Sequence, residues 1–188
     1  ALHAGSVTSG YRNKASYLLG PDFPGENPLC APALNRVAGR LQKLAGEAAE
    51  RRQRAEEDQH DETSEEVLRR TPLWVEAALK LTRTGDVGVK LLLRGLRPDD
   101  PRPWLEPLLR DCPEVVSVVV QPCPEGSKEK PAKSPWDPRY VEPIAVHGPP
   151  FVVELAPGPG DGRPGVSFRL SPDGFSEVNS SAEDAMFE

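Results

Sequence analysis

The chain has 188 residues, enough for one sizeable hydrophobic core or for one domain with an appendage. Hydrophobic residues make up 37% of it and 22 residues are proline, a composition that indicates an ordered core with long loops. The net charge is −6, but basic and acidic residues are segregated along the chain, so the acidic total does not exclude a polyanionic partner.

Cysteine and histidine are too few and too scattered to predict a disulfide framework or a metal site. There are three of each, and no C-x-x-C or other metal-ligand spacing occurs. No apolar run is long enough to cross a membrane, and the first residues lack the features of a signal peptide. We therefore expect an intracellular protein, cytoplasmic by default, with the nucleus or an organelle as alternatives.

The first third of the chain predicts a strand, a loop and a long helix. Residues 10–19 turn from polar to apolar as a strand does, and residues 20–30 are rich in proline and glycine. A helix is expected from Pro32 to about Asp58, followed by an acidic loop over residues 57–71. Its apolar residues recur at three- and four-residue spacings and form one face: Leu34, Val37, Leu41, Leu44 and Ala48.

Residues 74–94 alternate between apolar and polar side chains on both sides of the turn signal Thr84-Gly85-Asp86, which predicts a β-hairpin. In the first strand the apolar side chains that face one way are Val75, Ala77, Leu79 and Leu81. The side chains that face the other way are Glu76, Lys80 and Thr82.

A short helix is expected over residues 101–110, where Pro107 lacks an amide hydrogen, and a buried strand over residues 115–120. The loop at 122–141 is low in complexity and rich in proline. Its Trp136 and Tyr140 either stack on RNA bases or anchor the loop to the core, and we favour the anchoring role.

Three short strands follow at residues 144–146, 151–155 and 166–170, with a hairpin tip at 157–165. A further helix begins near the end of the chain, where Ser180 starts the capping-box pattern S-x-x-E. The order β, α, ββ, α, β, βββ, α predicts an α+β fold with a mostly antiparallel, mixed sheet and two main helices, in one domain over residues 1–188.

Three separated segments resemble one family, the RNA (uracil-5-)-methyltransferases. GYRNKAS at 10–16 resembles the Y-R-N-K strand of that family, and WVEAALKLTRTGDVGVKLLL at 74–93 is similar to the hairpin that follows it. FRLSPDGFSEVN at 168–179, which runs on into AEDAMFE, resembles F-R-I-S-P-x-x-F-F-Q-V-N. The order and approximate spacing of the three segments also fit.

The resemblance implies that the last helix leads into a Rossmann-like domain that binds S-adenosylmethionine, and that this domain is absent from the chain. In the family a cysteine thiolate adds to C6 of a flipped-out uridine, C5 takes the methyl group, and a carboxylate removes the C5 proton. The nucleophile and the cofactor loop would belong to that further domain. We expect no catalytic residue and no bound cofactor in this chain alone, and RNA (tRNA or rRNA) as the partner.

Five residues are candidates for RNA contact. Arg12 and Lys14 would touch phosphates, or they are the solvated face of a strand. Asn13 would bind RNA or close a turn, and we favour the turn. Lys90 and Arg94 lie on the face of their strand opposite the apolar one, as an RNA-facing patch or as a solvated sheet face.

Two further candidates lie beside the base and cofactor pocket that the resemblance implies. Phe175 would form a wall for the flipped base, or it packs in the core. Glu177 stands where the family carries Gln, and Ser176 where it commonly carries Phe. A carboxylate accepts hydrogen bonds but does not donate them, and it adds negative charge beside an RNA site. These departures lower the expectation of methyl transfer.

Three hypotheses follow. The chain is the substrate-positioning part of an RNA uracil-5-methyltransferase, or a non-catalytic RNA-binding or ribonucleoprotein assembly protein derived from that family. The third hypothesis is an unrelated protein-interaction domain, in which case the motif matches arise by chance.

Overall fold

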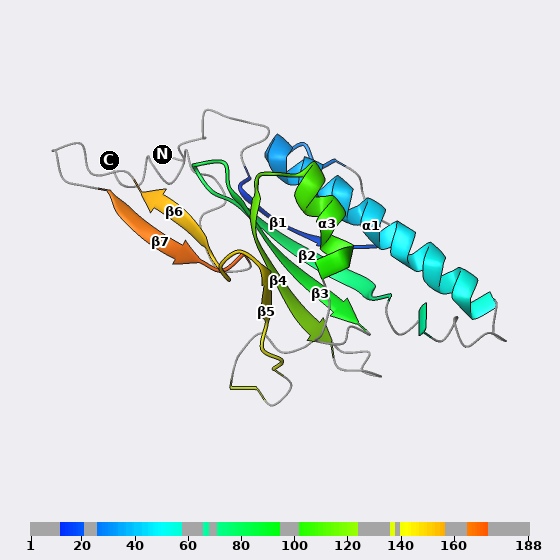
Figure 1. Cartoon of the computed structure of the whole chain (residues 1–188). Coiled ribbons are helices and arrows are strands. Elements are labelled where there is room, and N and C mark those ends of the chain that lie inside the picture. Colours follow the sequence, from blue (N-terminus) through cyan, green and yellow to red (C-terminus); the bar gives the residue numbers. More distant parts are fainter. Residues whose placement is uncertain are drawn as a thin grey trace.

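The computed structural model describes residues 12–20, 26–57, 66–67, 71–94, 102–123, 136–137, 140–156 and 165–172. A five-stranded sheet in the order β1-β2-β3-β4-β5 forms the body of the molecule. Two helices cover one face of this sheet, and a separate two-stranded ribbon, β6–β7, extends from one end (Figure 1). The α+β class predicted from the sequence is confirmed.

The long helix α1 spans Pro32–Glu57, within one residue of the expected range. Pro32 occupies its first position, where a fixed φ suits the helix and the missing amide hydrogen costs nothing. Its predicted apolar face is buried, with Leu34, Val37 and Leu41 fully enclosed against the sheet. Burial of each such side chain contributes roughly 1.5 to 3 kcal/mol.

Strands β2 (Leu73–Leu81) and β3 (Val87–Arg94) form the predicted antiparallel hairpin. Gly85 takes a φ of 92° in the connecting turn, a conformation that favours glycine. The amide of Thr82 donates to the carbonyl of Asp86 at 2.9 Å, and the side chains of Thr82 and Thr84 hydrogen-bond inside the turn. These contacts fix the register of the two strands.

Strand β1 (Lys14–Leu18) pairs antiparallel with β2, so the chain crosses over the sheet through α1 between two neighbouring strands. The strand begins at Lys14 and not at residue 10 as the sequence suggested. Arg12 does not pair with β2 but forms an isolated bridge with Cys30.

Helix α3 (Arg102–Asp111) connects β3 to β4 (Val115–Cys123), which lies parallel to β3. The helix is short, as its internal Pro107 predicts. Strand β4 runs on to Cys123, beyond the expected end at residue 120. Pro122 is tolerated there because β5 pairs only with residues Val118 to Val120, so no amide donor is needed at that point on the outer side of the strand.

Ion pairs join the two helices and the β4 entry. Arg36 contacts Glu114 at 2.6 Å, and Arg40 contacts Asp111 at 2.8 Å. The pKa of Asp111 is lowered by its hydrogen bond to Arg110, with a further contribution from Arg40. These four charged side chains lie on the helix side of the sheet, so they add no charge to the opposite face.

Strand β5 (Ile144–His147) pairs antiparallel with β4 and forms one edge of the sheet. Gly148 follows with a φ of 61°, and a Cβ there would lie 2.0 Å from the carbonyl oxygen of Val116, so only glycine fits. The chain then enters β6 (Val152–Ala156), which pairs with β7 (Val166–Leu170). The three short strands expected from the sequence are therefore present.

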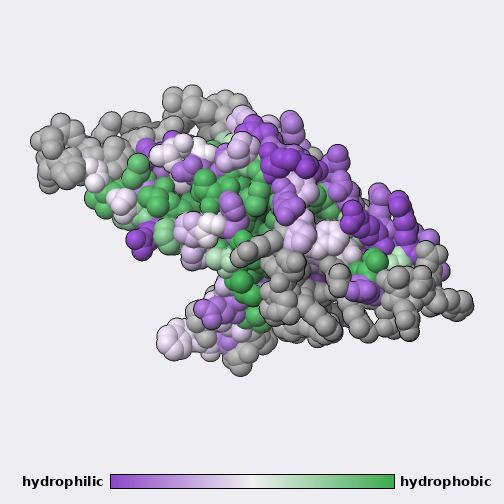
Figure 2. Space-filling model, in the orientation of Figure 1, coloured by the Kyte–Doolittle hydropathy of each residue, from purple (hydrophilic) through white to green (hydrophobic). Residues whose placement is uncertain are grey.

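Among the described residues, no helix is long and apolar enough to cross a membrane. Figure 2 shows hydrophilic side chains gathered toward α1 and apolar ones over the ribbon. The ribbon residues that leave large apolar side chains 42–56% exposed are Val153, Leu155, Val166 and Phe168.

Candidate nucleic-acid interface

The sheet face away from the helices carries the basic residues of the first three strands. Side chains alternate along a strand, so Lys14, Lys80 and Lys90 share this face, and so does Arg94, four residues beyond Lys90. We call it the open face. Its basic side chains come from β1, β2 and β3, which the hairpin and the β1–β2 ladder hold side by side.

Lys14 and Lys80 stand directly opposite each other on β1 and β2. Like charges at such a position repel. Glu154 of β6 reaches over the face, and its Oε2 atom lies 3.6 Å from the Lys80 Nζ atom. The Lys80 and Glu154 side chains are only 2% and 9% exposed, so this ion pair is buried where the ribbon meets the sheet.

Glu154 also binds the turn between β2 and β3. Its Oε1 atom accepts a hydrogen bond of 3.1 Å from the backbone amide of Arg83, and the Arg83 Nε atom lies 3.7 Å away. One carboxylate thus contacts two cationic side chains. With Lys14 nearby, the formal charge at this end of the open face stays positive.

The ribbon covers only one end of the open face. Val152 packs on Gly88, where an added Cβ would lie 2.6 Å from the Val152 Cγ1 atom. Lys90 and Arg94 lie further along β3, opposite Ala78 and Leu73 of β2, and both are half-buried. Their Cα atoms are four residue steps apart along the strand, about 13 Å. Glu76, also half-buried, is an acidic residue on the same face.

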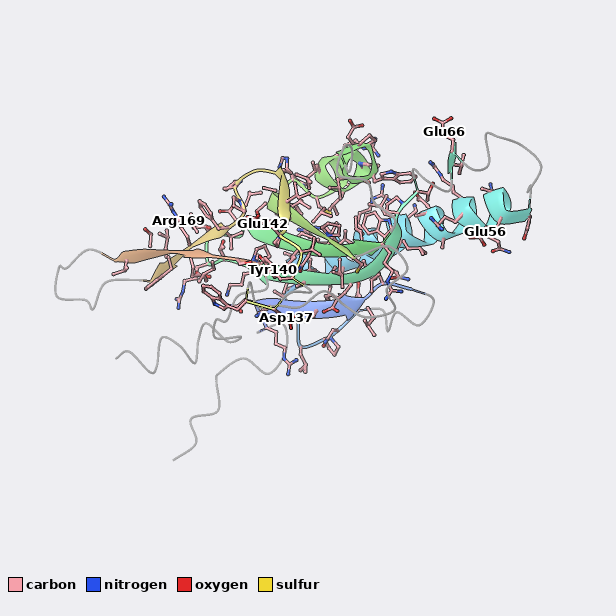
Figure 3. All side chains as sticks on the ribbon, turned by 90° about the horizontal axis from the view of Figure 1, so that it is seen from below. Glu56, Glu66, Asp137, Tyr140, Glu142 and Arg169 are labelled. Atoms are coloured by element: carbon pink, nitrogen blue, oxygen red, sulfur yellow. The ribbon has the colours of Figure 1, made fainter. Side chains whose placement is uncertain are left out.

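Val141 is tied to the open face through β4. The Gln121 side chain, on the same face as Lys90 and Arg94, donates a hydrogen bond of 2.8 Å to the carbonyl oxygen of Val141. In Figure 3, Asp137 and Tyr140 lie on the other side of the sheet from α3. The expectation that Trp136 anchors the loop in the core is wrong, because this residue is 94% exposed.

The predicted contact residues at the start of the chain differ in accessibility. Arg12 is exposed, and its backbone is held by Leu29 and Ala31. Asn13 is buried, and its carbonyl oxygen accepts a hydrogen bond of 2.7 Å from the amide of Leu81 at the end of β2. Lys14 is half-buried.

The structure therefore brings Lys14, Lys90 and Arg94 onto one face and leaves Arg12 beside it at the entry to β1. Their contact with RNA stays a prediction. Phe175 and Glu177, the candidates for the base and cofactor pocket, lie outside the described residues.

Sequence reasoning missed Glu154 and the burial of Lys80. The alternation in β2 placed Lys80 correctly on the face opposite the apolar one. A single acidic residue within the apolar strand FVVEL was the available signal for Glu154, since a carboxylate at such a position needs a cationic partner.

The described part of the chain contains no group of histidine, cysteine or acidic side chains that fits a metal ion. Cys30, Cys112 and Cys123 are all buried. Burial raises the pKa of the Cys112 thiol, and the neighbouring Glu114 carboxylate raises it further. A thiol in that state is a poor nucleophile.

No protein-family model and no curated protein sequence matches this chain. Its fold is similar to the crystal structure of Pyrococcus abyssi tRNA (uracil-54, C5)-methyltransferase in complex with S-adenosyl-L-homocysteine, with a TM-score of 0.54 and 14% sequence identity. The similarity covers 97% of this chain and 40% of that one, so the chain spans well under half the length of its structural neighbour. What the two proteins share at this identity is the fold.

Proposed function

We propose that this chain is the RNA-facing, substrate-positioning part of an S-adenosylmethionine-dependent RNA (uracil-5-)-methyltransferase that acts on tRNA or rRNA. The observation that carries the proposal is an agreement between sequence and fold. The methyltransferase-like motifs stand near the two ends of the chain, and the likeness to a tRNA methyltransferase structure extends over 97% of it.

The open face supports a role in holding RNA. Lys14, Lys90 and Arg94 present cationic groups from two different strands, and cationic groups bind the phosphate backbone without reading sequence. Such contacts fix the register of an RNA, which is what an enzyme needs before it flips one nucleotide out of a stack.

Methyl transfer itself would need a cysteine nucleophile and a cofactor-binding domain outside residues 1–188. S-adenosylmethionine would supply the methyl group in the whole protein. We propose that Phe175 and Glu177 border the pocket for the base and the cofactor, and that the domain boundary lies just after them.

A non-catalytic RNA-binding or ribonucleoprotein assembly protein is the second candidate. Two residues favour it, Glu177 in place of the family's Gln and Ser176 in place of its Phe. Both changes fall in the segment that resembles the family most closely.

Two measurements test the proposal. The affinity of this chain for an unmodified tRNA transcript, followed by fluorescence anisotropy, should fall steeply with salt concentration. The Lys90→Gln and Arg94→Gln variants should each reduce the slope of log K against log salt by roughly 0.7 to 0.9. Lys43→Gln, an exposed lysine on α1, is the matched control and should leave the slope unchanged.

The complete product of the gene should then be incubated with S-adenosylmethionine and the same transcript, and 5-methyluridine measured by nucleoside mass spectrometry. RNA binding with 5-methyluridine supports the enzyme. RNA binding without it supports the assembly protein, and the absence of any RNA binding refutes both.

A further inference from the structure

The carboxylate of Glu154 occupies a place that has the donors of an anion-binding site. Its Oε1 atom accepts a hydrogen bond of 3.1 Å from the backbone amide of Arg83. The Arg83 Nε atom lies 3.7 Å from Oε1, and the Lys80 Nζ atom lies 3.6 Å from Oε2. Backbone amides, lysine and arginine are also the groups with which proteins bind phosphate, so this place has the donors that a phosphate group needs.

The carboxylate of Glu154 fits this place loosely. Both ion-pair distances exceed the roughly 2.7 to 2.9 Å of a charge-assisted hydrogen bond. Within the described part of the chain, the Oε2 atom is buried and accepts no hydrogen bond. One carboxylate cannot neutralise two cations, and Lys14 stands directly opposite Lys80 on β1. A second anion would therefore be attracted to the same place.

The ribbon that carries Glu154 is a separate two-stranded sheet, which extends from one end of the main sheet (Figure 1). Its base is anchored by Ser117, whose Oγ atom donates a hydrogen bond of 2.6 Å to the carbonyl oxygen of Pro149, between β5 and β6. Beyond this anchor, Val152 rests on Gly88 and Glu154 makes the ionic contact. The ribbon can thus pivot about Pro149 without breaking a strand pairing of either sheet.

We propose that Glu154 competes with a phosphate of the bound RNA for Lys80 and Arg83. In the free protein the ribbon is closed, with Glu154 on the two cations, and an RNA phosphate takes its place as the ribbon lifts. A phosphodiester resembles the carboxylate, because each carries one negative charge shared by two oxygen atoms. Lifting the ribbon exposes Val152, which is 1% exposed, and this cost keeps the ribbon closed until RNA binds. The proposal rests on the proposed RNA-binding function and adds a regulated contact to it.

A variant that leaves the net charge unchanged gives the first test. Lys80→Met, Glu154→Leu removes the cation and its competitor together and keeps apolar bulk between ribbon and sheet. It should bind the tRNA transcript about five- to eightfold more weakly at 0.1 M salt, with a slope of log K against log salt that is lower by roughly 0.7 to 0.9, because one phosphate contact is lost. If the pair served only the fold, this variant would bind tRNA as the wild type does.

Removal of the competitor alone should have the opposite effect. Glu154→Gln should bind the transcript about three- to tenfold more tightly, because the closed ribbon lowers the apparent affinity by the fraction of molecules that are open. Glu142→Gln removes the same charge from an exposed residue before β5 and is the matched control. It should change the affinity by less than about twofold, since exposed charges are screened at physiological salt. Circular dichroism verifies that each variant is folded.

Movement of the ribbon is measured by labelling Val152→Cys with a maleimide. The native cysteines Cys30, Cys112 and Cys123 are buried, so the wild type gives the background rate. Saturating tRNA should raise the labelling rate of Val152→Cys severalfold, whereas potassium chloride of equal ionic strength should not. Inorganic phosphate should raise the rate less than tRNA does, because it lacks the further contacts of RNA with the open face.

The contrary results separate this proposal from the proposed function. If Lys80→Met, Glu154→Leu binds tRNA like the wild type while Lys90→Gln lowers the salt slope, Glu154 does not compete with RNA and the RNA-binding function stands. The same conclusion follows if bound tRNA leaves the labelling of Val152→Cys unchanged or slows it. A response to inorganic phosphate without one to tRNA would overturn RNA as the source of the phosphate. If the wild type does not bind tRNA at all, the proposed function fails and the competition fails with it.

Discussion

At the scale of single residues, the Lys80–Glu154 pair decides how the ribbon is held on the sheet. The lysine comes from a central strand and the carboxylate from a strand much later in the chain, and both are nearly inaccessible to water. Buried ion pairs often add little net stability, because desolvation of the two charges offsets their attraction. Removal of one partner alone is costly, because a buried charge then loses its nearest counter-charge.

Glu154→Gln should therefore lower the free energy of unfolding by about 3 kcal/mol. Urea unfolding followed by circular dichroism measures it. Glu50→Gln is the control, because Glu50 forms an exposed pair with Arg54 at 3.6 Å on the surface of α1, and its loss should cost at most about 0.5 kcal/mol. The double variant Lys80→Met, Glu154→Leu should recover most of the stability. Equal midpoints for Glu154→Gln and the wild type would show that the pair is not important for folding.

At the scale of elements, the sequence predicted the parts that depend on local pattern. The helix over Pro32–Glu57 and the hairpin of β2 and β3 follow from periodicities of 3.6 and 2 residues and from a glycine turn. Periodicity does not say which strands pair over long distances. The parallel pairing of β3 with β4 and the seating of β6 on the open face were therefore not predicted.

Because local periodicity does not reveal contacts between distant segments, only part of the candidate site was predicted. The alternation in β3 placed Lys90 and Arg94 together on one face, and the structure agrees. The burial of Lys80 depends on Glu154, a contact between segments far apart in the chain, which no local pattern reveals. The prediction that Trp136 anchors its loop in the core is wrong. It rested on the apolar character of the side chain, which favours burial on average but does not say where a loop places the residue.

Gly88 tests the seating of the ribbon on the sheet. A Cβ at this position would lie 2.6 Å from the Val152 Cγ1 atom and 3.1 Å from the Pro172 Cγ atom. Gly88→Ala should therefore destabilise the fold by about 1 to 3 kcal/mol, as overpacking does. Thermal unfolding of the variant and of Gly88→Ala, Val152→Ala should show that the second substitution relieves part of the cost of the first.

Gly46→Ala provides a control of opposite sign. Apart from the adjacent residues and the backbone of its own helix, no atom lies within 4 Å of a Cβ added there, and alanine stabilises a helix relative to glycine by roughly 0.5 to 1 kcal/mol. For the Gly88 test itself, the contrary result is that the effects of Gly88→Ala and Val152→Ala on unfolding simply add. Such additivity would contradict direct packing of these two residues.

At the scale of the whole molecule, the two faces of the sheet have different physical roles. The helix-covered face holds the continuous hydrophobic core, to which α1, α3 and the first four strands all contribute. The open face holds cations, one buried ion pair and the hydrogen bond from Gln121 to Val141. The proposed function places RNA binding on the side of the sheet opposite the core, and it predicts that substitutions of the half-buried Lys90 and Arg94 change RNA affinity with little effect on folding.

The core side predicts how stability depends on pH. Burial raises the pKa of Cys112 above its ordinary value of 9.0 and that of Tyr17 above 10.0, and for Tyr17 the neighbouring Cys30 thiol adds to the effect. The unfolded chain loses these two protons at lower pH than the folded chain does. Their contribution to stability is therefore complete below about pH 9 and declines as the pH rises further, by up to about 1.4 kcal/mol per pH unit for each group.

Urea midpoints measured from neutral to strongly alkaline pH should show this decline in stability. Two variants should separate the contribution of Cys112 from that of Tyr17. Cys112→Ala should remove the part that begins near pH 9, and Tyr17→Phe the part that begins near pH 10, each seen as a flatter curve than that of the wild type. Both substitutions also change packing and so lower the midpoint at every pH, which makes the slope and not the midpoint the informative quantity. Parallel curves for the wild type and both variants would mean that the two groups titrate alike in the folded and unfolded chains, and that water reaches this part of the core.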